Sequence, residues 1–159
     1  MFDRTPPDAR NAFHAAHAAL ILASHQRLTG RALLPSATAV EDGYRLYHAP
    51  LVVLAHAAAP DPVFFYANRA AQTLFEMDWD AMVALPSRLS AEPLARAERQ
   101  RLLDRVAAQG YIDDYTGIRI ARSGKRFLIE RATVWNLIGA AGQVVGQAAA
   151  FADWTPLTE

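Results

Sequence analysis

The stretch from Tyr115 to Trp154 constrains the fold most, because it divides into three β-like runs at two glycine-containing breaks. The first run, 115–121, ends at the turn Ser123-Gly124-Lys125. The second run, 126–138, is rich in the β-branched and aromatic residues that strands prefer. The segment 139–142 separates it from the third run, 143–154. The pattern predicts a three-stranded antiparallel meander, whose apolar face a second layer must cover.

The preceding residues predict that second layer and two further strands. Residues 1–8 hold two prolines and two acids, and we expect a flexible arm. Periodicity predicts an N-terminal helix from Ala9 to Leu28 that ends at Gly30, with an apolar stripe on one face. The stripe residues are Phe13, Ala16, Leu20, Ala23 and Arg27, with Ile21 and Leu28 beside them.

Further along the chain, a capping box at Thr38 predicts a short helix to Tyr47. Strands are predicted at 51–56 and 63–68, followed by short helices over 69–75 and 79–84. Ser90 is the expected N-cap of a long helix that ends before Gly110. The sequence thus predicts an α+β fold with a five-stranded antiparallel sheet, helices on one face, and an N-terminal helix.

Composition excludes several classes of function. The formal charge of the 159-residue chain is zero, so no strong field favours nucleic acid or an acidic membrane. No apolar run is long enough for a membrane span, and the N-terminus lacks the pattern of a secretion signal. We therefore expect a cytoplasmic protein. The chain has no cysteine, which excludes a covalent flavin adduct and a thioester-linked chromophore.

Local motifs resemble the PAS fold. The residues F-Y-A-N-R-A-A-Q-T-L-F (65–75) and G-A-A-G-Q-V-V-G (139–146) are similar to a PAS strand-to-helix junction and a PAS hairpin. A closer resemblance is to the MEKHLA domain, a PAS-related family, in its free-standing bacterial form. Five segments carry it: H-A-P-L-V-V-L-A-H (48–56), D-P-V-F-F-Y-A-N (61–68), L-P-S-R-L-S-A-E (85–92), G-Y-I-D-D-Y-T-G-I-R-I (110–120) and R-F-L-I-E-R-A-T-V-W-N-L (126–137).

The resemblance covers about residues 15–156. Together with the predicted elements it divides the chain into a flexible arm over 1–8, an N-terminal helix and connector over 9–37, and a PAS-like MEKHLA domain over 38–159. It implies a sensory or ligand-binding domain that holds a small molecule between sheet and helices and signals through dimer or partner contacts. A homodimer through the N-terminal helix and the outer sheet face, and an unidentified protein partner, are expected by the same analogy. The alternative is an interaction module whose core is filled and binds no ligand.

Polar residues embedded in the apolar runs are the candidate ligand contacts. Within 126–138, the alternation places Glu130 on the same side as Leu128 and Ala132, so a buried Glu130 needs a partner such as Arg119. Which face of this run is buried stays open, because Phe127, Ile129 and Trp135 suit the core as well as Leu128, Ala132 and Val134 do. The full candidate set is Asn68, Phe75, Trp79, Arg88, Leu103, Tyr115, Arg119, Phe127, Glu130, Trp135 and Gln147. A structural network around Asn68 is the alternative interpretation.

Other features favour ordinary structural roles. His14 and His17 stand one helical turn apart without further ligands, which indicates surface or interface histidines and no metal site. The long helix contains no histidine, so haem ligation there is disfavoured. Arg88, Arg96, Arg99, Arg101 and Arg105 alternate with acids, as on a solvated helix face.

Catalysis has little support in the sequence. There is no nucleophile elbow, phosphate-binding loop, dinucleotide fingerprint or zinc-hydrolase motif, and we expect no enzyme. The weaker alternative is a small enzyme that uses Glu130, Arg119 and Tyr115 in the same pocket. The ligand itself is not predicted.

Overall fold

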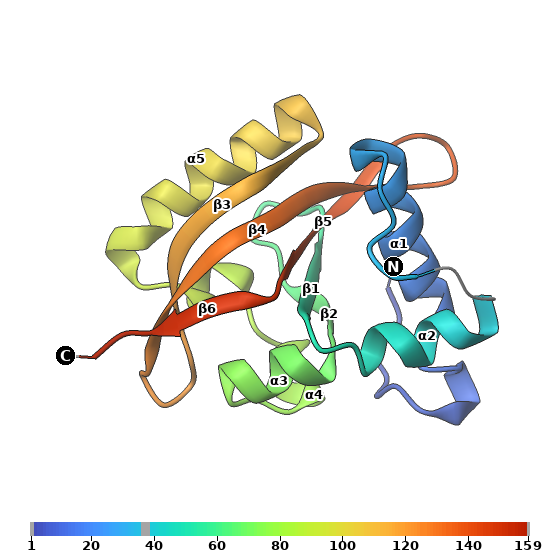
Figure 1. The fold of residues 1–159 in the computed structure, drawn as a ribbon, viewed down its shortest axis with the longest axis horizontal. Coiled ribbons are helices and arrows are strands. Elements are labelled where there is room, and N and C mark those ends of the chain that lie inside the picture. Colours follow the sequence, from blue (N-terminus) through green and yellow to red (C-terminus); the bar gives the residue numbers. More distant parts are fainter. Residues whose placement is uncertain (1, 36–38, 159) are drawn as a thin grey trace.

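A computed structural model describes residues 2–35 and 39–158, excluding the side chains of 39–40 and 93–96, and shows a sheet between two groups of helices (Figure 1). The helical elements are η1 (Ala9–Asn11), α1 (Ala15–Thr29), α2 (Ala39–Tyr47), α3 (Arg69–Phe75), α4 (Trp79–Met82), η2 (Ser87–Ser90) and α5 (Pro93–Gln109). The strands are β1 (Val52–Ala57), β2 (Phe64–Ala67), β3 (Tyr111–Ile120), β4 (Arg126–Ile138), β5 (Val144–Phe151) and β6 (Asp153–Pro156). Among these described residues, no helix has the length and hydropathy to cross a bilayer.

The sheet confirms the predicted α+β architecture. All pairings between its strands are antiparallel, and its order is β2-β1-β5-β4-β3. The predicted run 143–154 is two strands, because the chain breaks at Ala152 and β6 then pairs with the first half of β4. Strand β4 therefore has β5 beside its second half and β6 beside its first.

Two neighbouring residues of β4 show that helices cover both faces of the sheet. The indole N–H of Trp135 donates to the Ile21 carbonyl oxygen in α1 at 3.2 Å. The Asn136 side-chain amide donates to the Val106 carbonyl oxygen in α5 at 3.1 Å. Consecutive strand residues point to opposite faces, so α1 covers one face, termed here the α1 face, and α5 covers the other, termed the α5 face.

A bulge at Arg131 resolves which face of β4 is buried. Arg131 has a φ of 53°, in the left-handed region that a non-glycine residue seldom occupies. The extra residue shifts the alternation, so Phe127 and Ile129 before it and Ala132 after it pack in one cluster. Trp135 packs in the cluster of the α1 face. Phe127, Ile129 and Trp135 are thus all buried, on two different faces, whereas Leu128 is half-buried.

Helix α1 begins six residues later than predicted. Asp8 caps only the short turn η1, and Ala12, Phe13 and His14 then adopt left-handed backbone angles before α1 starts at Ala15. Gly43 of α2 permits this arrangement, because a Cβ atom there would lie 2.1 Å from the Ala12 carbonyl oxygen. The end of α1 at Gly30, with a φ of 75°, is as predicted.

The buried face of α1 also differs from the predicted stripe. The buried residues are His17, Ala18, Ile21, Ser24 and His25, whereas Ala16, Ala23 and Arg27 are exposed. The polar members are buried because backbone groups satisfy them. The Ser24 hydroxyl accepts from the Ile138 N–H at 2.9 Å, and the His25 Nδ1 bonds to the Arg31 carbonyl oxygen at 2.9 Å.

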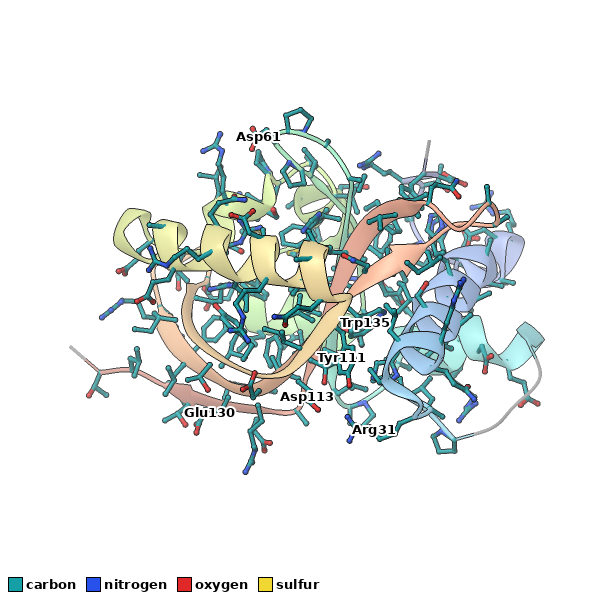
Figure 2. All side chains as sticks on the ribbon, turned by 90° about the horizontal axis from the view of Figure 1, so that it is seen from above. Arg31, Asp61, Tyr111, Asp113, Glu130 and Trp135 are labelled. Atoms are coloured by element: carbon teal, nitrogen blue, oxygen red, sulfur yellow. The ribbon has the colours of Figure 1, made fainter. Side chains whose placement is uncertain are left out.

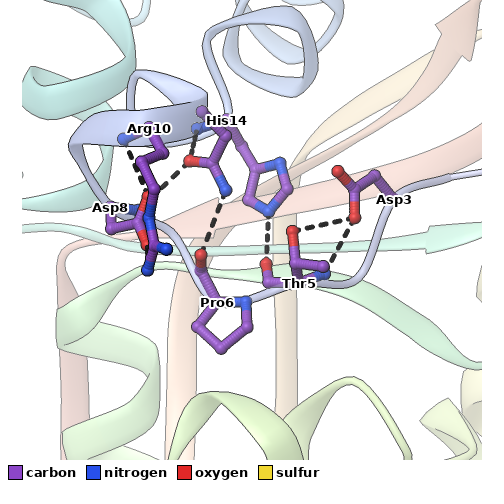
Figure 3. Close-up of polar contacts among 7 residues, drawn as sticks. Asp3, Thr5, Pro6, Asp8, Arg10 and His14 are labelled. Carbon is purple, nitrogen blue, oxygen red and sulfur yellow. Dashed lines mark hydrogen bonds and ion pairs between the residues drawn. The ribbon is translucent and has the colours of Figure 1, made fainter.

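The described part of the predicted flexible arm makes specific contacts with the domain. The Phe2 ring stacks on Phe65 with centroids 3.7 Å apart. The Trp79 indole donates to the Arg4 carbonyl oxygen at 2.9 Å. Figure 3 shows the His14 ring bonded to the Thr5 carbonyl oxygen at 2.6 Å. Residues 2–8 therefore run alongside α1.

Helix boundaries before the site differ slightly from prediction. Glu92, not Ser90, is the N-cap of α5, and Ser87–Ser90 form the separate turn η2. Pro93 occupies the first turn, where its missing N–H is not needed. Thr38, the predicted cap of α2, lies outside the described residues.

Candidate functional site

A cavity of about 60 Å³ lies between α5 and the α5 face of the sheet. Its wall is mainly apolar, with residues from β1, β2, α3, α5, β4 and β5: Leu54, Phe64, Phe75, Leu102, Leu103, Ile129, Ala132, Val134, Ala148, Ala149 and Phe151. Six polar residues complete it: His56, Ser90, Arg99, Tyr115, Arg119 and Gln147. A water needs roughly 10–15 Å³ by this measure, so the volume suits about five non-hydrogen atoms.

Helix α5 brings Arg99 into this wall. Arg99 stands three residues before Leu102 and seven before Val106, so the three share the buried stripe of the helix. Arg99 is 7% exposed and bonds to the Ser87 hydroxyl of η2. Arg101 and Arg105 are exposed, as the solvated-face interpretation predicts. That interpretation is wrong for Arg99, because it grouped the arginines by charge and not by helical position.

Strand β3 contributes Tyr115 and Arg119, which alternate with Gly117 on the α5 face. A Cβ atom at Gly117 would lie 2.1 Å from the Tyr115 hydroxyl oxygen, so glycine lets the tyrosine ring lie along the strand. The Arg119 guanidinium carbon lies 5.2 Å from the centroid of that ring. This cation–π contact, with the bond from Arg119 to the Ile118 carbonyl oxygen at 3.0 Å, fixes the guanidinium beside the cavity.

Strands β1 and β5 contribute His56 and Gln147, which face each other in the register. Burial lowers the pKa of His56 to about 4, and its Nδ1 bonds to the Ala57 carbonyl oxygen at 3.1 Å. The ring is therefore neutral at pH 7 with its Nδ1 protonated. The Gln147 amide nitrogen donates to the Asn136 side-chain oxygen at 3.2 Å. Its carbonyl oxygen is buried and has no hydrogen-bond partner among the described residues.

Five of the candidate residues predicted from the sequence line the cavity: Phe75, Leu103, Tyr115, Arg119 and Gln147. Asn68 does not. It is fully buried, accepts from the N–H groups of Val53 and Ala71, and donates to the carbonyl oxygens of Leu46 and Leu51. These four bonds join β1, α3 and the end of α2, which matches the alternative interpretation of Asn68 as a structural residue.

The other candidates lie outside the cavity wall. Arg88 is exposed and pairs with Asp61 at 3.0 Å. Trp79 packs against the N-terminal arm, and Trp135 lies under α1. Phe127 contacts Phe75 edge to face, one layer behind the wall.

Glu130 does not pair with Arg119. It accepts a hydrogen bond from the Thr155 hydroxyl at 3.0 Å and lies opposite Asp153 in the pairing of β4 with β6. Figure 2 shows Glu130 at the edge of the sheet, away from α5. The bulge at Arg131 is the reason, because it places Glu130 on the other face from Ala132. The trio of Glu130, Arg119 and Tyr115 that the enzyme alternative requires is therefore not assembled.

The sequence predicted surface or interface positions for the two N-terminal histidines, and the structure buries them under the N-terminal arm. His14 and His17 are buried, and their rings stack with centroids 4.4 Å apart. Each ring bonds to a backbone carbonyl oxygen of the arm, at Thr5 and Asp3 respectively. Across the described ranges, no group of three or more His, Cys, Asp or Glu side chains is placed to hold a metal ion.

Sequence reasoning missed Arg99, His56 and Ser90 as cavity residues. Arg99 was detectable, because it continues the stripe of Leu102 and Val106 one turn toward the N-terminus. His56 was also detectable, because it lies two residues after Leu54 on the same side of a strand. Ser90 carried no such signal, since a serine before a helix indicates a cap.

Comparison with solved structures shows the PAS fold. A PAS domain of a protein from Colwellia psychrerythraea aligns with a TM-score of 0.62 at 13% identity, over 74% of this chain and 95% of that one. A light-oxygen-voltage domain studied with a flavin analogue aligns with a TM-score of 0.54 at 16% identity, over 74% and 84%. The aureochrome 1 light-oxygen-voltage domain in its dark state aligns at 0.51 and 16%, over 81% and 90%.

Comparison of sequences gives a family match without a characterised relative. The profile of the MEKHLA domain matches residues 15–156. No curated protein matches the chain.

Proposed function

The chain is a member of the MEKHLA domain family, and on that premise we propose that it is a sensory domain that binds a small molecule between the sheet and α5. One observation carries the proposal: polar side chains from α5, β1, β3 and β5 converge on an apolar cavity, and one of their acceptors, the Gln147 carbonyl oxygen, has no partner in the described parts of the chain. Buried polar atoms are nearly always bonded, so a ligand atom there would complete the site.

The position of the cavity supports a route for the signal. Gln147 faces the cavity, and Ala148 and Ala150 of the same strand belong to the cluster under α1. A ligand that shifts β5 would therefore change the packing of α1, provided that it binds the two arrangements with different affinity. Dimerisation through the N-terminal helix and the outer sheet face, a protein partner and a cytoplasmic location stay predictions.

A second candidate function is a ligand-free interaction module. The volume of the cavity favours it, because about 60 Å³ lies well below the roughly 300–1,000 Å³ of drug-sized ligand pockets. In that case the cavity would hold only ordered water bonded to Gln147.

Native mass spectrometry of freshly purified protein, with an absorption spectrum of the same sample, tests the proposal. We expect a mass above that of the chain, and its loss in Ala149→Leu, which fills the cavity. The control is Ala108→Leu, the same substitution at an exposed position of α5. A bare, colourless chain that no compound stabilises in a thermal-shift screen would favour the interaction module.

A further inference from the structure

We propose that the ligand of this cavity is a small organic carboxylate, with its negative end between Arg99 and Arg119 and its apolar part against Leu54, Phe75 and Phe151. The inference rests on the proposed function, because it specifies the chemistry of a ligand that the cavity is proposed to bind. The two guanidinium groups carry the argument.

Both arginines are buried without a carboxylate. Arg99 is 7% exposed and Arg119 is 9% exposed, and both line the cavity. In the described part of the chain, neither has an Asp or Glu oxygen within ion-pair distance. Their partners are a serine hydroxyl, a carbonyl oxygen and an aromatic face, which leave most of their ten N–H donor positions unused.

The two positive charges also act on each other. Burial, and secondly the charge of Arg119, lower the pKa of Arg99 to about 10, which still leaves it protonated at pH 7. Like charges in a site of low dielectric repel strongly. An anion between them would replace this repulsion with two attractive, charge-assisted contacts.

The nearby acids are engaged elsewhere. Asp61 pairs with Arg88 at 3.0 Å, and Glu92 pairs with Arg126 at 2.7 Å. Among the described residues that line the cavity, none is acidic. These residues supply two cations to the wall and no anion, although the formal charge of the chain is zero.

The remaining wall favours a carboxylate over an inorganic anion. Most of the lining is apolar, and a phosphate would leave several of its oxygens against carbon. A carboxylate has two oxygens, which match the two guanidinium groups, and a hydrocarbon part that matches the aliphatic and aromatic wall. The volume suits about five non-hydrogen atoms, so butyrate, with six, is a suitable probe.

The first experiment compares three probes by calorimetry in a buffer free of carboxylates. We expect butyrate to bind, and butyramide, its neutral isostere, to bind at least tenfold more weakly or not at all. Equal binding of butyramide would overturn the carboxylate inference and leave the proposed function standing. Binding of inorganic phosphate without butyrate would overturn it in favour of an inorganic anion.

The second experiment uses matched variants on one helix. Arg99→Met is expected to weaken butyrate binding roughly ten- to hundredfold, and to leave the melting temperature of the free protein unchanged or raised, because one of two repelling charges is gone. Arg119→Met is expected to act in the same direction. Arg101→Met, at an exposed position of α5, should alter neither quantity.

The two readouts separate the possible outcomes. A lower melting temperature in Arg99→Met with unchanged butyrate binding would show that the arginine is structural, and would overturn the inference. If none of the three probes binds and native mass spectrometry shows the bare chain, the proposed function fails together with the inference. A co-purified neutral molecule would sustain the proposed function alone.

Discussion

The polar groups on the two faces of the sheet differ in how fully the chain satisfies their hydrogen bonds. On the α1 face, the Trp135 indole, the Ser24 hydroxyl and the His25 ring each bond to a backbone group of the chain. On the α5 face, within the residues that the structure describes, no carboxylate pairs with Arg99 or Arg119 and no group bonds to the Gln147 carbonyl oxygen. A face whose polar groups are satisfied internally is a structural core, whereas a face with unused donors and acceptors is completed from outside.

Tyr66 departs from this division. Its hydroxyl is fully buried in the cluster of the α1 face without a hydrogen-bond partner among the described residues, and burial raises its pKa strongly. The ring contacts Trp79 edge to face at 5.9 Å, so packing holds it in place. The rest of the contrast gives four measurable differences.

Truncating a buried side chain should lower the free energy of unfolding more on the α1 face than on the α5 face. Trp135→Ala removes a fully buried side chain, and we expect the free energy of unfolding to fall by about 4 kcal/mol. Leu103→Ala, at the half-buried edge of the cavity, should cost less than about 1.5 kcal/mol. Urea unfolding measures both. Similar losses would mean that the two faces are packed alike, and Trp135→Phe offers a milder variant that keeps the chain folded.

Larger side chains at two adjacent positions of β5 should affect the free energy of unfolding differently on the two faces. Ala150 is buried under α1, so Ala150→Leu should lower the free energy of unfolding by about 2 kcal/mol through overpacking. Ala149 lines the cavity, where the added carbons have space, so Ala149→Leu should change it by less than about 1 kcal/mol. A larger loss in the free energy of unfolding for Ala149→Leu than for Ala150→Leu would contradict this difference between the faces.

Each face also carries a histidine that is disfavoured in its charged form. Burial depresses the pKa of His56 from 6.5 to about 4 and lowers that of His17. Below pH 6.5 the unfolded chain binds a proton that the folded chain refuses, so stability is full above pH 6.5 and falls toward pH 4. The loss at His56 should be at most about 3 kcal/mol, reduced because the ring keeps some exposure.

Unfolding curves at pH 7, 6, 5 and 4.5 measure this loss. His56→Gln should flatten the dependence most and His17→Gln less, while the titration of the carboxylates stays common to all three proteins. If the free energy of unfolding of wild type and His56→Gln depended on pH identically, His56 would not be a buried, neutral residue of the cavity wall.

The smallest effect is expected at Glu130, which lies on the opposite side of the sheet from the cavity and is only half-buried. Its carboxylate bonds to the Thr155 hydroxyl at the edge of the sheet. Glu130→Gln should therefore change the free energy of unfolding by less than about 0.5 kcal/mol. A loss near 3 kcal/mol would indicate a buried ion pair and contradict the position that the bulge assigns to it.

The sequence predicted the hairpins better than the faces. Both ends of β4 were predicted correctly, because Gly124 and Gly142 mark turns that need positive φ angles, of 94° and 83°. The bulge was not predicted, since a strict two-residue alternation assumes that no residue is inserted and arginine has no preference for left-handed angles. One such residue was enough to place Glu130 on the wrong side.

The residues of the candidate site were likewise predicted only in part. Tyr115, Arg119 and Gln147 were found because polar residues inside apolar strands are conspicuous. Arg99 was missed because a helix of mixed charge hides one buried cation unless each position is assigned to a face. The buried Ser24 of α1 was missed because the backbone group that satisfies it, the Ile138 N–H, lies 114 residues away. The buried His17 and His25 were missed because they bond to carbonyl groups of irregular segments, at Asp3 and Arg31, which helical periodicity does not place.

The hydrogen bond between Ile21 and Trp135 spans 114 residues, which sets the order of events during synthesis. Helix α1 leaves the ribosome first, but the surface it covers is made of the last strands. At roughly 5–20 residues per second, the helix waits on the order of 6–20 seconds for that surface. During that time the face of α1 that the sheet will later cover is exposed to water. Three of the five residues that become buried are polar, two histidines and a serine. This composition lowers the tendency of the nascent helix to aggregate before the sheet forms.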